Sequence, residues 1–271
     1  MAQRPLVTLT TDFGLNDHFV GTVKGVILSI APEAEIVDVC HAVRSFDILD
    51  GALAIASAYS YFPPGTVHMV VVDPGVGSSR RPIVATTEQH YFVAPDNGVL
   101  SLIYAREERL RVHHVTSEHY FLSPVSQTFH ARDIFAPVAA YLARGVPAGK
   151  LGEQISDFVR FQMPQPKQIN PGILRGVVLK VDHFGNLITN LTPQDAPALF
   201  QPAAVVKILV GGKAVSEIHT SYSEGAPGEV FGILGSMGYL EIAANRGSAA
   251  QQLAAVKGTD VDVITEAAAG A

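Results

Sequence analysis

Residues 67–82 read V-H-M-V-V-V-D-P-G-V-G-S-S-R-R-P, and this stretch decides the fold. Its unbroken apolar run predicts a strand that is buried on both faces of a sheet. The strand ends at Asp73, because Pro74 cannot continue a hydrogen-bonded ladder and the following glycine permits a turn. Open α/β sheets bind ligands at the carboxyl ends of such strands, which makes Asp73 a candidate functional residue. The alternative is that Asp73 only caps a turn and that Arg80 and Arg81 are solvated surface charges.

The segments around this strand alternate between strand and helix patterns. Residues 6–11 and 36–39 favour strands, and apolar residues at helical spacing predict helices over 19–30 and 47–62. This alternation predicts an α/β domain with a doubly wound, mostly parallel sheet. The elements expected after it are strands at 82–87, 90–94 and 112–115 and helices at 99–105 and 132–144.

A proline-rich segment, Q-M-P-Q-P-K-Q-I-N-P-G at 162–172, is typical of a stiff spacer between domains. After it, short strand-like runs separated by glycine-rich turns predict a smaller antiparallel β-barrel or sandwich. We therefore expect an α/β domain at 1–163, a linker at 164–171 and a β-barrel domain at 172–271. The runs are 174–191, 205–210, 214–220, 230–234 and 239–243, with a hairpin turn at Gly211-Gly212 and a helix at 248–256.

Composition describes a compact globular protein of 271 residues, with 48% hydrophobic and 16% charged residues. The net charge of −6 argues against non-specific binding to nucleic acid or to an anionic membrane. The single cysteine, Cys40, excludes an internal disulfide and suits the reducing cytoplasm. No signal-peptide pattern and no apolar stretch of membrane-spanning length is present. We expect a cytoplasmic protein.

Four polar groups stand at expected strand ends or helix starts, and each has a structural alternative. The carboxylate of Asp12 could accept hydrogen bonds from a ribose diol, bind a metal or cap the next helix. The motifs of dinucleotide enzymes, P-loop NTPases and serine hydrolases are absent, whereas a histidine-and-aspartate metal hydrolase stays possible. The groups are Asp12 with Asn16 and Asp17; Asp73 with Arg80; Asp96-Asn97-Gly98, a common turn; and His130 with Arg132 and Asp133.

Six motifs in the same order resemble the S-adenosylmethionine hydroxide adenosyltransferase family, the adenosine-forming S-adenosylmethionine hydrolases that are relatives of fluorinase and chlorinase. The resemblance runs from about residue 5 to about residue 265. The motifs are T-T-D-F-G (10–14), V-D-P-G-V-G (72–77), A-P-D-N-G (94–98), F-H-A-R-D-I-F-A-P (129–137), D-H-F-G-N-L-I-T-N (182–190) and G-Y-L-E-I-A-A-N (238–245).

The resemblance implies attack of a water-derived oxygen on the 5′ carbon of S-adenosylmethionine, which gives adenosine and methionine without a cofactor or a metal. The family's catalytic trio matches Asp73, Arg80 and His130, and the residue that takes the proton stays open. Chain spacing favours Arg80 over Arg81 as the partner of Asp73, and we expect Arg81 to be a surface charge. The alternatives are a halogenase, which the carboxylate of Asp73 disfavours by repelling halide, and a nucleoside- or S-adenosylmethionine-binding protein without catalysis.

The resemblance also assigns substrate contacts. In the first domain Asp12 matches the carboxylate that binds the ribose, Asp17 lies near the methionine end, and Phe46 forms an aromatic wall. The resemblance further implies a homotrimer, with each site between the first domain of one subunit and the barrel of the next. The matches in the second domain are Asp182 for the methionine ammonium, Asn186 for the adenine edge and Ser236 for the methionine carboxylate, with Met237 where halogenating relatives carry an arginine.

Overall fold

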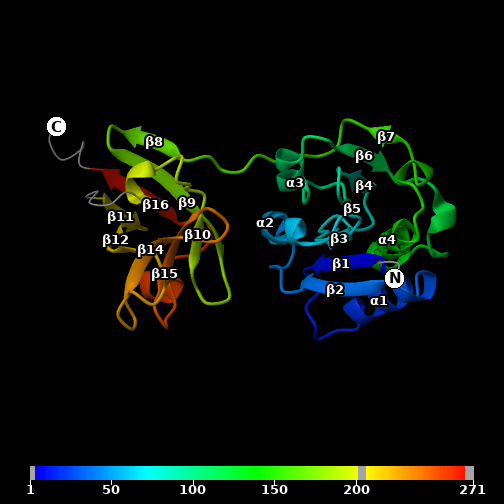
Figure 1. Cartoon of the computed structure of the whole chain (residues 1–271), viewed down its shortest axis with the longest axis horizontal. Helices are drawn as coiled ribbons and strands as arrows, with labels where there is room; N and C mark the ends of the chain where they lie inside the picture. The colour runs from blue at the N-terminus through cyan, green and yellow to red at the C-terminus, as the bar shows by residue number, and fades with distance from the viewer. Residues whose placement is uncertain (1–3, 201–205, 266–271) are drawn as a thin grey trace. The chain divides into compact units, whose positions relative to one another are not determined.

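The computed structural model describes residues 4–200 and 206–265, and the chain divides into two compact units between Gln162 and Met163. Each unit has its own sheet and its own core (Figure 1). Part of the expected linker is a strand: β8 (Lys167–Asn170) pairs with β9 (Ile173–Val181). The prolines of this segment flank the strand instead of interrupting it, and an exposed edge strand tolerates them there.

The first unit is built on a seven-stranded sheet in the order β2-β1-β3-β5-β4-β6-β7. The pairs β1–β2, β1–β3 and β3–β5 are parallel, as predicted, and the pairs beyond β5 are antiparallel. The α/β fold class is therefore confirmed. The strands are β1 (Leu6–Thr11), β2 (Glu35–Cys40), β3 (Val67–Val71), β4 (Pro82–Thr86), β5 (Tyr91–Pro95), β6 (Arg111–His114) and β7 (Gln154–Ile155).

Helices cover both faces of the parallel strands. Met69 on β3 belongs to the same core as residues of α1 (Phe19–Ile30) and α4 (Ala136–Ala143). On the other face α2 (Ile48–Ala58) lies so close that a Cβ atom at Gly51 would be 2.8 Å from Val72 Cγ2. A strand covered on both sides must be apolar throughout, which explains the run that begins at Val67.

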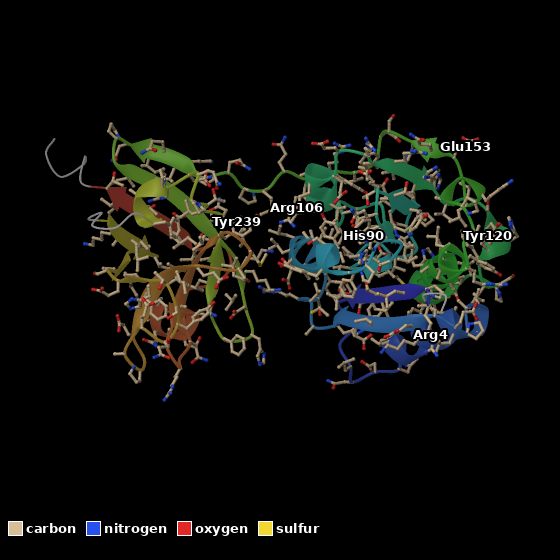
Figure 2. All side chains as sticks on the ribbon, viewed as in Figure 1. Arg4, His90, Arg106, Tyr120, Glu153 and Tyr239 are labelled. Carbon is tan, nitrogen blue, oxygen red and sulfur yellow. The ribbon has the colours of Figure 1, made fainter. Side chains whose placement is uncertain are left out.

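His68 and His90 are buried inside this unit, and no role was expected for either from the sequence. Thr8 Oγ1 lies 2.7 Å from His68 Nδ1, and the His68 and His90 rings are 5.1 Å apart. Figure 2 shows His90 among the densely packed side chains of the first unit. Burial lowers the pKa of His68 to about 3, so its imidazole is neutral and acts as a core residue.

Several helices are shorter than their sequence patterns predict. The helix expected at 132–144 begins with a π-helical turn (Ala131–Phe135) and becomes α4 at Ala136. Pro137 lacks an N–H, and the carbonyl of Asp133 instead accepts a 2.8 Å hydrogen bond from the backbone N–H of Leu122. The other shortened helices are α2, which continues as a 3₁₀ turn (Tyr59–Tyr61), α3 (Ser101–Arg106) and α5 (Ala249–Leu253).

The second unit contains one nine-stranded sheet, antiparallel except for the β13–β14 pair, in the order β12-β11-β16-β9-β10-β15-β14-β13 with β8 on β9. The sheet curls around its main core, because Ile208 of β11 and Leu240 of β15 belong to the same buried cluster. A smaller cluster of Phe231, Ile233 and Ala243 is separate from it. This curled sheet agrees with the expected barrel-like domain. Its remaining strands are β10 (Leu187–Thr189), β11 (Val206–Val210), β12 (Lys213–Val215), β13 (Ile218–His219), β14 (Val230–Leu234), β15 (Leu240–Ala244) and β16 (Asp260–Thr265).

The two-residue hairpin predicted at Gly211-Gly212 is confirmed. It joins β11 to β12, and both glycines have positive φ angles, 54° and 83°, which L-residues with a side chain rarely adopt. Residue 205, included in the expected strand, lies outside the described residues. Within residues 4–200 and 206–265, no helix is both long enough and apolar enough to cross a membrane.

Candidate active site

The carboxyl ends of β1 and β3 meet at one edge of the first sheet. Thr11 is in register with Val71, so Asp12 and Asp73, which follow these strands, lie at the same edge. Together with the segments 45–46 and 128–131 they line a cavity of about 270 Å³. Four phenylalanines contribute to its walls, Phe13, Phe19, Phe46 and Phe129.

Asp73 and His130 line this cavity, and they form a hydrogen-bonded trio with Arg80, which does not line it. Arg80 Nε donates to both carboxylate oxygens of Asp73, at 3.1 and 3.0 Å, and Arg80 Nη2 donates to Oδ2 at 2.5 Å. The same Nη2 lies 2.7 Å from His130 Nδ1. The Asp73 and Arg80 side chains are only 6% and 9% exposed. Bidentate pairing in a site this dry fixes the carboxylate in one orientation.

The contact with Arg80 defines the tautomer of His130. A guanidinium nitrogen only donates hydrogen bonds, so Nδ1 accepts and the ring proton of the neutral imidazole lies on Nε2. Burial, followed by the positive charge of Arg80, lowers the pKa of His130 below its ordinary value. His130 is therefore a neutral imidazole that can donate a hydrogen bond from Nε2.

The lowered pKa of His130 predicts a contribution to stability that depends on pH. Between that lowered pKa and about 6.5, the unfolded chain binds the proton and the folded chain does not, so the free energy of unfolding rises with pH. We expect His130→Asn to show a smaller rise between pH 5 and pH 7.5 than the parent protein in urea titrations. An unchanged rise would show that His130 titrates normally in the folded state.

The carboxylate of Asp12 holds the neighbouring loop. Its Oδ2 accepts a 2.8 Å hydrogen bond from the backbone N–H of Phe46, a 72% exposed aromatic residue whose φ angle is +66°. Asp12 does not cap the following helix, because the residue at the N-cap of α1 is His18. Asp12 and Phe46 both line the cavity. Asp17, assigned with them from the sequence, is exposed and does not line it.

Arg81 is not a solvated surface charge, which corrects the expectation from chain spacing. Its Nε and Nη2 donate to Asp96 Oδ2 at 2.9 and 2.7 Å, and its Nη1 donates to Asp157 at 2.9 Å. The antiparallel pairing of Pro82 with Pro95 brings Arg81 opposite the buried Asp96. The following Asn97 donates to the carbonyl of Val72 at 2.8 Å, so this turn supports the residue that precedes Asp73.

The second unit has a pocket of its own, with a volume of about 640 Å³. Asp182, Asn186, Ser236 and Met237 all line it, which brings together every residue that the sequence assigned in this unit. The carboxylate of Asp182 accepts three hydrogen bonds from the turn that follows it. The donors are Asn186 N, Asn186 Nδ2 and the backbone N–H of residue 184, at 2.8 to 2.9 Å.

Sequence reasoning missed two residues of this pocket, Tyr222 and Glu241. The Tyr222 hydroxyl donates to Glu241 Oε2 at 3.0 Å, and Glu241 is only 6% exposed. Burial, and then the negative charge of Asp182, raises the pKa of Glu241; burial also raises the pKa of Tyr222 to about 12. The available signal was the charged residue inside the otherwise apolar strand L-E-I-A-A.

Across the part of the chain that the structure describes, no group of three or more His, Cys, Asp or Glu side chains is arranged to hold a metal ion. The polar side chains that line the two pockets carry carboxylate, guanidinium, imidazole, phenol, hydroxyl and amide groups.

Comparisons with known proteins match both units. A family model described as SAM hydroxide adenosyltransferase N-terminal domain matches residues 7–152, and the model of its C-terminal domain matches 176–262. A Salinispora tropica protein named (R)-S-adenosyl-L-methionine hydrolase is 37% identical over 95% of this chain and 97% of its own. A protein named fluorinase from an Actinoplanes species is 28% identical over 89% of this chain and 91% of its own. A crystal structure of a conserved protein from Thermotoga maritima has a TM-score of 0.88 and 37% identity, with coverage of 95% and 99%.

Proposed function

The chain belongs to the SAM hydroxide adenosyltransferase family, and we propose that it is an enzyme that hydrolyses S-adenosyl-L-methionine to adenosine and L-methionine. The observation that carries this proposal is the buried trio of Asp73, Arg80 and His130, of which Asp73 and His130 line a cavity that contains four phenylalanines. A carboxylate that is fixed in a dry site suits the positioning of a water molecule for attack.

In the proposed mechanism, Asp73 accepts a hydrogen bond from the attacking water. The water oxygen bonds to C5′ while the C5′–sulfur bond breaks. The electron pair of the broken bond stays on sulfur, so the sulfonium becomes the neutral thioether of methionine. The sulfonium is a good leaving group, so no acid has to protonate it. The water proton passes to the carboxylate of Asp73 and then to solvent. Arg80 orients Asp73, and His130 donates from Nε2 toward the developing hydroxide.

The same carboxylate favours water over a halide as the nucleophile. Chloride or fluoride next to Asp73 would face a negative charge in a site that excludes most solvent, and this repulsion grows as the dielectric constant falls. A water molecule instead gains an acceptor for its proton. Hydrolysis is therefore the better supported activity, even though some relatives are named fluorinase.

We assign the substrate contacts as follows. Asp12 binds the ribose hydroxyls, and Phe46, whose backbone N–H is held by Asp12, stacks along the substrate. In the second unit Asn186 contacts adenine, Asp182 the methionine ammonium and Ser236 the methionine carboxylate, which is supported by their shared pocket. Asp17 near the methionine end is the assignment with the least structural support.

We further propose a homotrimer in the cytoplasm, with sites at the subunit interfaces. Light scattering of the purified protein would measure the oligomeric state directly. Mixing Asp73→Asn with Asn186→Ala subunits under exchange conditions tests the shared site, because residues from two subunits would then recombine into one intact site. Recovery of activity supports the assembly, and a monomer in light scattering would rule it out.

The function is tested by incubating the purified protein with each sulfonium epimer of S-adenosyl-L-methionine and quantifying adenosine and methionine by chromatography. We expect equimolar adenosine and methionine, no dependence on added chloride, and undiminished activity in EDTA, since we propose a reaction without cofactor or metal. Formation of a 5′-halo-adenosine in place of adenosine would favour the halogenase, whereas tight binding without product would favour a binding protein.

A further inference from the structure

The pocket of the second unit holds a second acid besides Asp182. Glu241 lies on β15 in register with Ile188 of β10 and Ile233 of β14, so it occupies the interior of the sheet and not an edge. A Cβ atom at Gly235 would overlap its carboxyl group. The carboxyl group of Glu241 is therefore packed against Gly235, the residue that precedes Ser236, and it lines this pocket.

The hydrogen bonds of the two acids differ. Asp182 accepts three N–H bonds from its own turn, two on Oδ1 and one on Oδ2. Glu241 accepts one bond, from the Tyr222 hydroxyl to Oε2, and no donor among the described residues reaches its Oε1. Oε1 is not among the fully buried atoms that lack a partner, so it is open to a donor from a ligand in the pocket. Glu241 therefore has the free acceptor, although Asp182 was the acid assigned from the sequence.

The charges around Glu241 favour a cation as the missing partner. Its buried surroundings and the negative charge of Asp182 both raise its pKa, and a positive charge placed between the two acids would offset both effects. Arg246 is the one cationic side chain that lines the pocket. It is exposed, and among the ion pairs of residues 4–200 and 206–265 none joins it to either acid, so it does not supply this charge.

We propose that Glu241 binds the α-ammonium group of the methionine moiety, together with Asp182, and so makes this pocket selective for substrates that carry a cationic amine. The inference rests on the proposed function for the identity of the substrate. It adds a second carboxylate to the amine subsite, contributed by a strand whose position is fixed by pairing on both sides.

The test compares S-adenosyl-L-methionine with the analogue in which hydrogen replaces the α-amino group. We expect Glu241→Gln to lower kcat/KM for S-adenosyl-L-methionine by about 10- to 100-fold, the range for a charged hydrogen bond, mainly through KM. The analogue lacks the ammonium, so its kcat/KM with Glu241→Gln should stay within about threefold of the value with the parent protein. The preference for the amine, which is the ratio of the two kcat/KM values, should therefore fall by about 10- to 100-fold. Equal losses for both substrates would indicate a structural role and overturn the proposal.

Two further variants keep the result interpretable. Glu217→Gln removes the same charge from an exposed position of the same unit outside the pocket, and it should leave the amine preference unchanged. Tyr222→Phe removes the hydroxyl donor while Glu241 remains, so the preference should persist even if Glu241→Gln does not fold. An equal loss of preference in Glu217→Gln, or its disappearance in Tyr222→Phe, would contradict a direct contact with the amine.

A binding measurement separates this inference from the proposed function. Calorimetry compares L-methionine with 4-(methylthio)butanoic acid, which lacks the amino group. If the protein binds L-methionine more tightly and Glu241→Gln removes that difference, the amine subsite stands even if no adenosine is released from S-adenosyl-L-methionine. If the protein hydrolyses S-adenosyl-L-methionine but binds both acids equally, the function stands and the role of Glu241 is wrong.

Discussion

Replacing Asp73 by asparagine should lower kcat for adenosine formation by about 10³-fold or more, because the group that accepts the water proton is removed. Asparagine has nearly the same shape, so the cavity keeps its walls. An amide has only one acceptor oxygen, so it keeps only some of the hydrogen bonds that Arg80 donates to the two carboxylate oxygens. The amide also cannot take a proton from water at neutral pH. The measurement is single-turnover adenosine release, with calorimetry of adenosine binding, which should stay close to that of the parent protein.

The matched control for this variant is Asp96→Asn. Asp96 is also a buried carboxylate bound by an arginine of the same unit, with a side chain only 2% exposed, but it lies outside the cavity. Breaking either buried pair should destabilise the fold by about 3 kcal/mol. Both variants therefore lose stability, and only Asp73→Asn should lose turnover at a temperature where the proteins are folded. Equal turnover in Asp73→Asn and the parent would remove Asp73 from the mechanism.

The sequence predicts the part of the fold that local patterns control. A strand covered on both faces must be apolar at every position, so the run at 67–72 identifies β3, and the alternation of strands and helices identifies the parallel half of the sheet. The order β5-β4-β6-β7 is not a local property, because it depends on which strands pair across the sheet. Strand β8 was not predicted, because prolines flank it and all four of its residues are exposed, so no buried apolar pattern marks it.

The candidate site shows the same division. Asp73 and Arg80 lie seven residues apart, so chain spacing alone suggests their contact, whereas His130 joins them from 50 residues away. Only family resemblance could indicate that contact in advance. Arg81 was misjudged for a related reason: its partner Asp96 arrives through the pairing of β4 with β5, which spacing along the chain does not encode.

Glu241 illustrates a third kind of omission. Its motif was recognised as part of the family resemblance, but alternation along a strand does not reveal that both faces of β15 are buried. Once every residue of a strand is inside, a carboxylate there needs a partner or a ligand. Burial, which only the structure provides, turns an ordinary charged residue into a candidate for binding.

Replacing Arg80 by lysine should lower kcat by about 10²-fold or more even though the positive charge remains. The guanidinium reaches both oxygens of Asp73 and also His130 Nδ1, through Nε and Nη2. A lysine ammonium is a compact charge on a flexible chain and cannot make all of these contacts in one fixed geometry. Asp73 then loses its orientation. The control is Arg81→Lys, whose arginine binds Asp96 and Asp157 outside the cavity, and its kcat should stay within a few-fold of the parent value.

Replacing Arg80 by glutamine instead separates charge from geometry, because the kcat of each variant can be followed against pH. The positive charge of Arg80 is one cause of the lowered pKa of His130, after burial. Lysine retains that charge, so the acidic limb of its pH profile should stay near that of the parent. Glutamine removes it, so the pKa of His130 should rise and the acidic limb should move to higher pH.

Near-parent turnover in Arg80→Lys would show that the positive charge alone is enough. Identical limbs in all three proteins would show that His130 does not titrate in the active form, and that Arg80 acts only through Asp73.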